Sequence, residues 1–180
     1  MMVLIILMIL AIVLFIILIK YNEIIAQKNK VKQAKSGIDI YLNQRFDLIP
    51  NLVECVKVYS KHEKDLIENI TKTRSEYIVN KSLRKAEKLN NNMNKLVAVA
   101  ENYPELKASE QYLNLQKNLT KIESQLQAAR RIYNSEVTKY NTIILKVPTN
   151  IIAHMFNFKE EELFEIEEFK RENINMNLEG

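Results

Sequence analysis

The first nineteen residues of the chain, Met1 to Ile19, are all apolar, and a lysine follows them directly. An α-helix rises about 1.5 Å per residue, so this run approaches the roughly 30 Å thickness of a bilayer's hydrocarbon core. A backbone inside lipid must satisfy its own hydrogen bonds, which favours a helix there. The run therefore predicts a single transmembrane helix over residues 1–20.

A secretory signal peptide is the competing interpretation of an N-terminal apolar run. It requires a basic start, a shorter apolar core and small residues at a cleavage site. Met1 and Met2 lead straight into the apolar run, and the Lys20–Glu23 segment after it carries no such site. The single cysteine, Cys55, lies far downstream, which disfavours a lipoprotein signal and excludes an intrachain disulfide. We therefore expect an uncleaved anchor.

The charges beside the apolar run predict its orientation. Basic residues close to a span tend to stay in the cytoplasm. The lysines nearest the run all follow it: Lys20, Lys28, Lys30, Lys32 and Lys35. We expect the N-terminus outside a bacterial cell (inner) membrane, the remaining chain in the cytoplasm, and anionic lipid as the partner of residues 1–35. The net charge of +4 needs no nucleic acid to explain it, and no nucleic-acid-binding motif is present.

The rest of the chain has the composition of an all-α domain. Only 2 glycines and 3 prolines occur in 180 residues, and no stretch alternates polar and apolar residues for long. Apolar residues recur every three or four positions between Leu106 and Val147, which predicts one long helix there. This apolar seam consists of Tyr112, Leu115, Leu119, Ile122, Leu126, Ala129, Tyr133, Val137, Tyr140, Ile144 and Val147.

A second apolar seam continues from the predicted span into the domain, through Val31, Ile38, Leu42, Ile49, Val53 and Val56. Pro50 predicts a kink or a break of this helix between Leu48 and Asn51, the kink being preferred. Shorter helices are expected over 62–79 and 83–103. Two long and two short helices with narrow apolar stripes predict an antiparallel four-helix bundle over residues 21–148.

Polar residues beside the two seams form a stripe that a purely apolar bundle would not need. The candidate stripe consists of Asp39, Arg45, Asn51, Glu123, Arg130, Asn134 and Asn141. One interpretation is a satisfied polar network that fixes the register of the helices, which we prefer. The other is a ligand site, because arginines inside a bundle attract an anion.

Several spaced motifs resemble the LemA family. They are Ile38-Asp39, Arg45-Phe46-Asp47-Leu48-Ile49-Pro50-Asn51-Leu52-Val53, His62-Glu63, Tyr103-Pro104-Glu105-Leu106-Lys107-Ala108, Ala129-Arg130-Arg131-Ile132-Tyr133-Asn134 and Tyr140-Asn141. The resemblance runs from about Tyr21 to Phe158. It implies a bacterial membrane protein with one span and a cytoplasmic helical bundle, and no established catalytic reaction. The family's shared positions carry over, without an assigned chemical role, as Asp39, Arg45, Asn51, Arg130, Tyr133, Asn134 and Asn141.

The sequence predicts no catalytic residues, no metal site and no cofactor. The only histidines, His62 and His154, have no second ligand at metal spacing. Cys55 lies on the apolar side of its helix with no histidine close in sequence, as a buried structural thiol would. With only Gly37 and Gly180, no glycine-rich phosphate loop is possible. We therefore expect a protein that is not an enzyme.

The last segment, residues 149–180, forms a separate amphipathic and acidic tail. Apolar residues from Ile151 to Phe158 precede a glutamate-rich run that is interleaved with Leu163, Phe164, Ile166 and Phe169. A helix laid over the bundle, with its aromatic residues buried, is the preferred interpretation. A partner-binding or autoinhibitory tail is the alternative. Residues 173–180 are expected to be disordered.

Two functions from different classes agree with these features. The first is a membrane-anchored scaffold or adaptor that presents a cytoplasmic bundle to a membrane-protein partner or to itself. The second is a membrane-tethered sensor that binds an anionic small ligand near Arg45 and Arg130. The scaffold is preferred, because the sequence offers an anchor and packing seams but no isolated chemical constellation.

Overall fold

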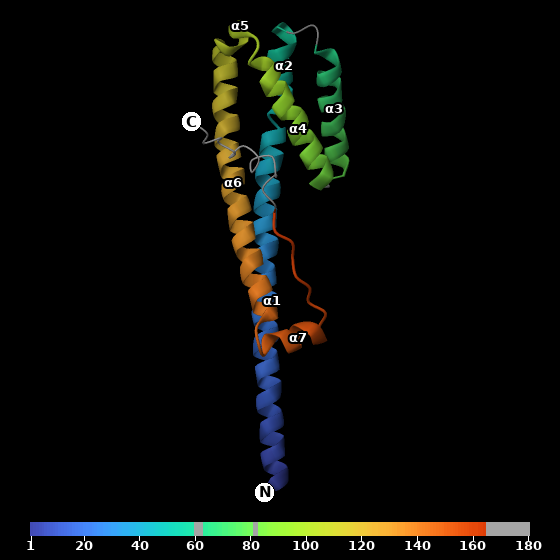
Figure 1. The fold of residues 1–180 in the computed structure, drawn as a ribbon, viewed down its shortest axis with the longest axis vertical. Helices are drawn as coiled ribbons and strands as arrows, with labels where there is room; N and C mark the ends of the chain where they lie inside the picture. Colours follow the sequence, from blue (N-terminus) through green and yellow to red (C-terminus); the bar gives the residue numbers. More distant parts are fainter. Residues whose placement is uncertain (60–62, 81–82, 165–180) are drawn as a thin grey trace, which may run out of the picture. The chain divides into compact units, whose positions relative to one another are not determined.

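The computed structural model describes residues 1–59, 63–80 and 83–164, and every regular element within them is an α-helix (Figure 1). The all-α prediction is confirmed for this part of the chain. The helices are α1 (Met2–Phe46), α2 (Ile49–Tyr59), α3 (Lys64–Val79), α4 (Leu83–Ala100), α5 (Pro104–Lys107), α6 (Glu110–Leu145) and α7 (Thr149–Met155).

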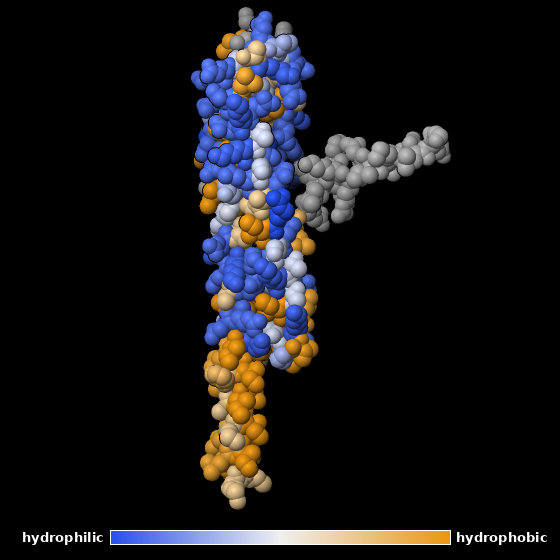
Figure 2. Space-filling view, turned by 90° about the vertical axis from the view of Figure 1, so that its left-hand side faces the viewer, coloured by the Kyte–Doolittle hydropathy of each residue, from blue (hydrophilic) through white to orange (hydrophobic). Residues whose placement is uncertain are grey.

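The N-terminal part of α1 is long and apolar enough to cross a membrane. An 18-residue window there has a mean hydropathy of 3.7, and none of it is buried. The space-filling view shows this end as hydrophobic throughout, whereas most of the remaining visible surface is hydrophilic (Figure 2). It is the one such helix among the described residues.

The chain divides into two compact units. One unit, called the anchor unit below, consists of Met1–Ser36 and Ala129–Gly180, and the other, called the head unit, consists of Gly37–Ala128. Both α1 and α6 contribute residues to each unit. The predicted domain limits at residues 20 and 148 follow a different criterion and stay a prediction.

The two predicted seams supply half of the buried apolar residues in the described chain. All six residues of the seam from Val31 to Val56 are buried, and so are nine of the eleven residues of the seam from Tyr112 to Val147. Ile122 is half-buried, and Val147 is exposed because α6 ends at Leu145. In the head unit, α3 packs against α4, and α2 packs against α4 and α5.

The predicted interruption near Pro50 is present. After α1 ends at Phe46, Asp47 and Leu48 form a turn, and α2 begins at Ile49. Pro50 lies in the first turn of α2, where its missing N–H leaves no hydrogen bond unmade.

The single helix expected between Leu106 and Val147 is wrong, because Ala108 and Ser109 separate α5 from α6. Ser109 has the chemistry that starts a new helix. Its Oγ accepts a hydrogen bond from the N–H of Tyr112 at 3.3 Å, as a serine at an N-cap does. Pro104 occupies the first turn of the short α5.

Among the described residues, the helix expected in the tail is limited to α7, and the chain after it is not helical. After α7, Asn157 has a φ of 55°, a left-handed conformation that asparagine tolerates and that ends helices. Residues 158–164 then continue without regular secondary structure. The part of the predicted tail after Phe164 lies outside the described residues, and so does His62.

Candidate functional site

Two asparagines of α6 hold the backbone of the C-terminal segment in the anchor unit. Asn141 donates from Nδ2 to the carbonyl of Glu161 at 2.9 Å and accepts at Oδ1 from the N–H of the same residue at 3.0 Å. Asn134 does the same with Phe164, at 3.0 and 2.8 Å. Each amide side chain therefore pairs with one peptide residue as a neighbouring β-strand would.

The spacing of these contacts explains why the segment is extended. Residues 134 and 141 are seven positions apart on a helix, which corresponds to about 10.5 Å along its axis. Residues 161 and 164 are three positions apart, and three residues of extended chain also span about 10 Å. The two amides therefore match the repeat of an extended segment that runs antiparallel to α6. We call the pair Asn134 and Asn141 the asparagine ladder.

The Phe164 side chain packs against two residues of α6. Its ring lies edge-on to Tyr133, with ring centroids 5.5 Å apart, and the Arg130 guanidinium lies 5.7 Å from its centroid. The Tyr133 hydroxyl donates to the carbonyl of Glu162 at 3.1 Å. Burial, with a smaller contribution from the carboxylates of Glu161 and Glu162, raises the pKa of Tyr133. The hydroxyl therefore stays protonated as a donor at neutral pH.

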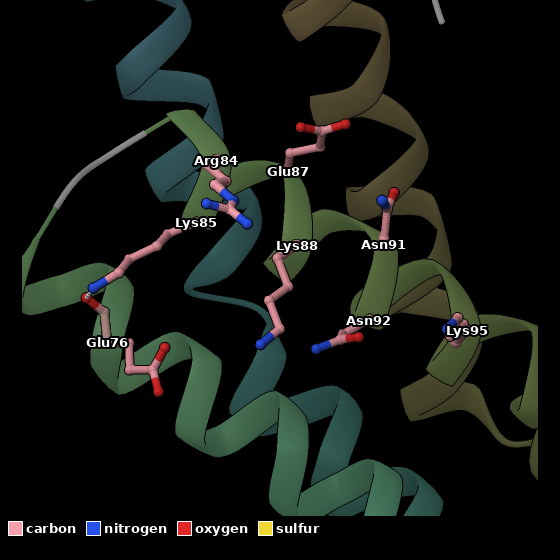
Figure 3. A pocket seen from close by; sticks show the side chains of 8 residues that line it. All are labelled: Glu76, Arg84, Lys85, Glu87, Lys88, Asn91, Asn92 and Lys95. Carbon is pink, nitrogen blue, oxygen red and sulfur yellow. Dashed lines mark hydrogen bonds between the residues drawn. The ribbon is translucent and has the colours of Figure 1, made fainter.

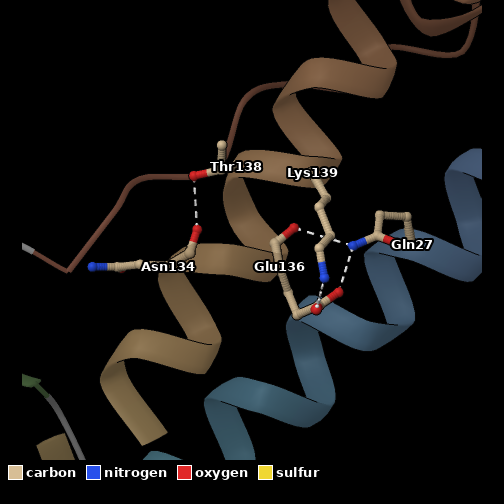
Figure 4. A network of polar contacts seen from close by, with 5 residues as sticks. All are labelled: Gln27, Asn134, Glu136, Thr138 and Lys139. Carbon is tan, nitrogen blue, oxygen red and sulfur yellow. Dashed lines mark hydrogen bonds and ion pairs between the residues drawn. The ribbon is translucent and has the colours of Figure 1, made fainter. Parts of the chain in front are cut away.

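A polar contact also joins α1 to α6 in the anchor unit (Figure 4). The buried Gln27 donates from Nε2 to Glu136, both to its Oε2 at 2.7 Å and to its carbonyl at 3.2 Å. Lys139 donates to the other carboxylate oxygen at 2.6 Å. The hydrogen bond from Lys139, followed by that from Gln27, lowers the pKa of Glu136. This contact fixes the register of the two helices.

A separate charged cluster lies in the head unit. Arg45 of α1 forms an ion pair with Glu123 of α6 and donates to Asn94 of α4 at 2.8 Å. The Arg45 side chain is only 11% exposed, and that of Glu123 is 32% exposed. Gln127 donates to the second oxygen of Glu123 at 3.2 Å. The cluster links three helices, which is what a structural network does.

The other two predicted stripe residues lie at the surface of the head unit. Asp39 is exposed, and its carboxylate adds to the burial that raises the pKa of Tyr77. Asn51 is also exposed and lines a hollow of about 170 Å³ beside Cys55. That thiol is buried, and burial raises its pKa, so it is a poor nucleophile.

A larger hollow of about 690 Å³ lies between α3 and α4 (Figure 3). Its side chains are of both charges: Glu76, Arg84, Lys85, Glu87, Lys88, Asn91, Asn92 and Lys95. Lys85 donates to the carbonyl of Glu76 at 3.3 Å. The hollow is open to solvent, so its charges are hydrated and screened. Within the described ranges, no group of three or more His, Cys, Asp or Glu residues could hold a metal ion.

The predicted stripe is therefore distributed over two units. Asp39, Arg45, Asn51 and Glu123 belong to the head unit, whereas Arg130, Asn134 and Asn141 belong to the anchor unit. Sequence reasoning missed the partners Gln27, Asn94 and the backbone of residues 161–164. The one available signal was the seven-residue spacing of two asparagines on the same helix face.

Comparison with known proteins gives a family and several relatives. The model of the LemA family matches residues 34–178. Two magnetosome proteins of Paramagnetospirillum magneticum, MamQ 1 and MamQ 2, are each 22% identical over alignments that cover 83% of this chain and 66% of the relative. The protein LemA of Metamycoplasma hominis is 25% identical, with 85% of this chain and 72% of the relative covered. The chain thus spans just under two thirds of the length of the MamQ relatives.

Proposed function

This chain belongs to the LemA family, and from that premise we propose that it is a single-pass, membrane-anchored scaffold or adaptor without catalytic activity. Its helical domain presents protein-binding surfaces to membrane proteins or to further copies of itself. Two of the relatives are named magnetosome proteins, and that role is not extended to this chain.

The observation that carries the proposal is the continuity of α1. One helix runs from Met2 to Phe46. Its first turns are apolar and wholly unburied, and later turns contribute Ile24 and Val31 to the core of the anchor unit. A lipid-embedded helix that continues into a packed core leaves no flexible linker between anchor and domain. Such a connection suits a protein that holds a partner at the membrane surface.

The topology and location are part of the proposal. We place the anchor in the cell (inner) membrane of a bacterium with the N-terminus outside, because basic residues follow the apolar run. We also propose an antiparallel bundle with four members. The first member is α1 together with α2, the second is α3, the third is α4, and the fourth is α5 together with α6. The packing of α3 on α4, and of α2 on α4 and α5, supports this arrangement.

A sensor that binds an anionic ligand is the second candidate, and one observation favours it. The Nε of Arg130 is buried and has no hydrogen-bond partner among the described residues. A guanidinium with a donor to spare attracts a carboxylate or phosphate. The carboxylate of a small anion is the ligand that this arrangement fits.

Cross-linking in membranes tests the scaffold. The full-length chain is cross-linked at native abundance, and cross-linked proteins are identified by mass spectrometry. The control carries Ile9→Arg and Leu10→Arg, which place two charges in the middle of the apolar run at a cost of about 2.5–3.5 kcal/mol each. One abundant partner that the control loses supports an adaptor, and anchor-dependent self-cross-links support a homo-oligomeric scaffold. Identical cross-links in both chains would refute membrane-dependent scaffolding.

Charge reversal at Arg130 separates the two candidates. Under the scaffold proposal, Arg130→Glu lowers the thermal stability first, because the substitution removes the guanidinium that lies 5.7 Å from the centroid of the Phe164 ring. A sensor instead loses its biological response while the cross-linked partners are retained. Arg131→Glu is the matched control, since Arg131 is the next residue and is exposed. If both reversals have the same effect, the role assigned to Arg130 is wrong.

A further inference from the structure

The short helix α7 has an apolar face that nothing in the described chain covers. Its inner face, Thr149, Ile152 and Ala153, is buried in the anchor unit. Its outer face carries Ile151, 66% exposed, and Met155, 59% exposed, one helical turn apart. Soluble proteins rarely leave contiguous apolar surface in water, and such surface marks a contact with lipid or protein.

The exposed apolar surface extends beyond the helix itself. Before α7 in the sequence, Leu145 and Val147 are exposed, Val147 by 79%, and directly after α7 Phe156 is exposed. We call this surface, formed by Leu145, Val147, Ile151, Met155 and Phe156, the apolar foot.

The apolar foot lies where α1 leaves its apolar run. The ring of Tyr21 contacts that of Phe156, with centroids 4.8 Å apart, and lies 5.9 Å from that of Phe158. Tyr21 is two residues after Ile19, about 3 Å along the helix axis. Figure 1 shows α7 beside α1 at the start of the protruding N-terminal part. Headgroup regions are roughly 5–7 Å thick on each side of a bilayer, so Tyr21 and the Phe156 ring that contacts it reach one of them when the apolar run spans the bilayer.

The charges around the foot fit an anionic lipid surface. Residues 145–159 contain Lys146 and Lys159 and no aspartate or glutamate. The glutamates that follow turn away from the foot, since Glu161 bonds to Asn141, one helical turn before Leu145 on α6. Lys28 lies in the part of α1 that follows the span, and its ammonium is 5.6 Å from the centroid of the Phe158 ring. Basic residues beside an apolar face, together with a tyrosine at the end of the span, are typical of elements in the membrane interface.

We propose that the apolar foot inserts into the headgroup region of the bilayer as a second membrane contact, in addition to the span of α1. The occupant of this face is lipid rather than protein, because the foot adjoins the end of the span and the segment that forms it carries lysines but no carboxylate side chain. The inference rests on the proposed membrane anchoring. Two contacts at one membrane surface fix the rotation of α1 about its own axis, which a single span leaves free.

Spin-label accessibility in membranes tests the proposal. Full-length protein is reconstituted in vesicles of phosphatidylcholine and phosphatidylglycerol, with one label at Ile151→Cys or at Met155→Cys. The exposed Ile132→Cys of α6 serves as the aqueous control, and Ile9→Cys reports the span. Wild-type protein, whose Cys55 is buried, measures background labelling. Collisions with oxygen and with a water-soluble nickel chelate are compared, because oxygen concentrates in lipid and the chelate in water.

The expected result is a shift of the oxygen-to-nickel ratio at positions 151 and 155 towards the value at position 9 and away from that at 132. If the ratio at position 9 indicates lipid while the ratios at 151 and 155 equal that at 132, the proposed membrane contact of the foot is wrong and the proposed anchor is retained. If position 9 itself is in water, the proposed anchoring fails. Protection of 151 and 155 from both reagents, or spin–spin broadening that grows with protein density, would mean that protein covers the foot and would also overturn the proposal.

Discussion

The asparagine ladder predicts how strongly the C-terminal segment is held. The substitution Asn141→Ala removes both hydrogen bonds to Glu161 without touching the apolar core. Each neutral hydrogen bond contributes about 0.5–1.5 kcal/mol net, so the pair contributes about 1–3 kcal/mol to closing the segment. Every 1.4 kcal/mol is about a factor of ten, so hydrogen exchange at the Glu161 amide should accelerate roughly 5- to 140-fold.

Hydrogen–deuterium exchange of the full-length protein in lipid, resolved at residues 158–164, measures this change. The Phe164 amide is an internal reference, because Asn134 still holds it and its exchange should change less. Thr142→Ala is the matched control, since Thr142 is an exposed neighbour whose hydroxyl donates to the carbonyl of Thr138 in its own helix. If Glu161 exchanges no faster in Asn141→Ala than in the control, the amide does not hold the segment and the ladder is refuted.

Three further predictions concern the anchor unit. The Tyr140 hydroxyl is fully buried without a hydrogen-bond partner among the described residues, so Tyr140→Phe should leave the free energy of unfolding unchanged or raise it by about 1 kcal/mol. Tyr133→Phe should lower it by about 1 kcal/mol, because its bond to Glu162 is lost; urea denaturation compares the two, and equal effects would contradict the assignment. The hydrogen bond from Lys139 lowers the pKa of Glu136 in the folded protein. The Glu136 carboxylate therefore stabilises the fold at a pH above its pKa in the unfolded chain, and this stabilisation is lost as the pH falls through its pKa in the folded protein. In Glu136→Gln, the melting temperature should fall less steeply as the pH is lowered than it does in the wild type. An unchanged fall would show that Glu136 does not contribute to this pH dependence.

The sequence predicted the helices and much of the core because helical periodicity is a local signal. Residues such as Val137 and Tyr140 recur on one face and are buried there. Val147 continues the same spacing but is exposed, because the helix ends two residues before it. Periodicity says which residues share a face, and only the ends of the helix decide how far that face extends.

The candidate site was predicted only as a set of residues on a stripe. Asn134 and Asn141 were identified, but their partner was expected to be another helix or a ligand. That partner is backbone some twenty to thirty residues further along the chain, and backbone atoms leave no pattern in side chains. Asn94 was missed for a different reason, since it lies in an asparagine-rich run that also fits a turn or a compositional bias.

The asparagine ladder has a consequence for how this segment can diverge between relatives. Both amides bond to peptide groups, which every residue except proline presents alike. The residue types at positions 161 to 163 can therefore vary between relatives without loss of these hydrogen bonds. Only proline at 161 or 164 would remove an N–H that bonds to an asparagine. Related chains with the same contact should be found by two asparagines seven residues apart on the final long helix, even where their tails share no recognisable motif.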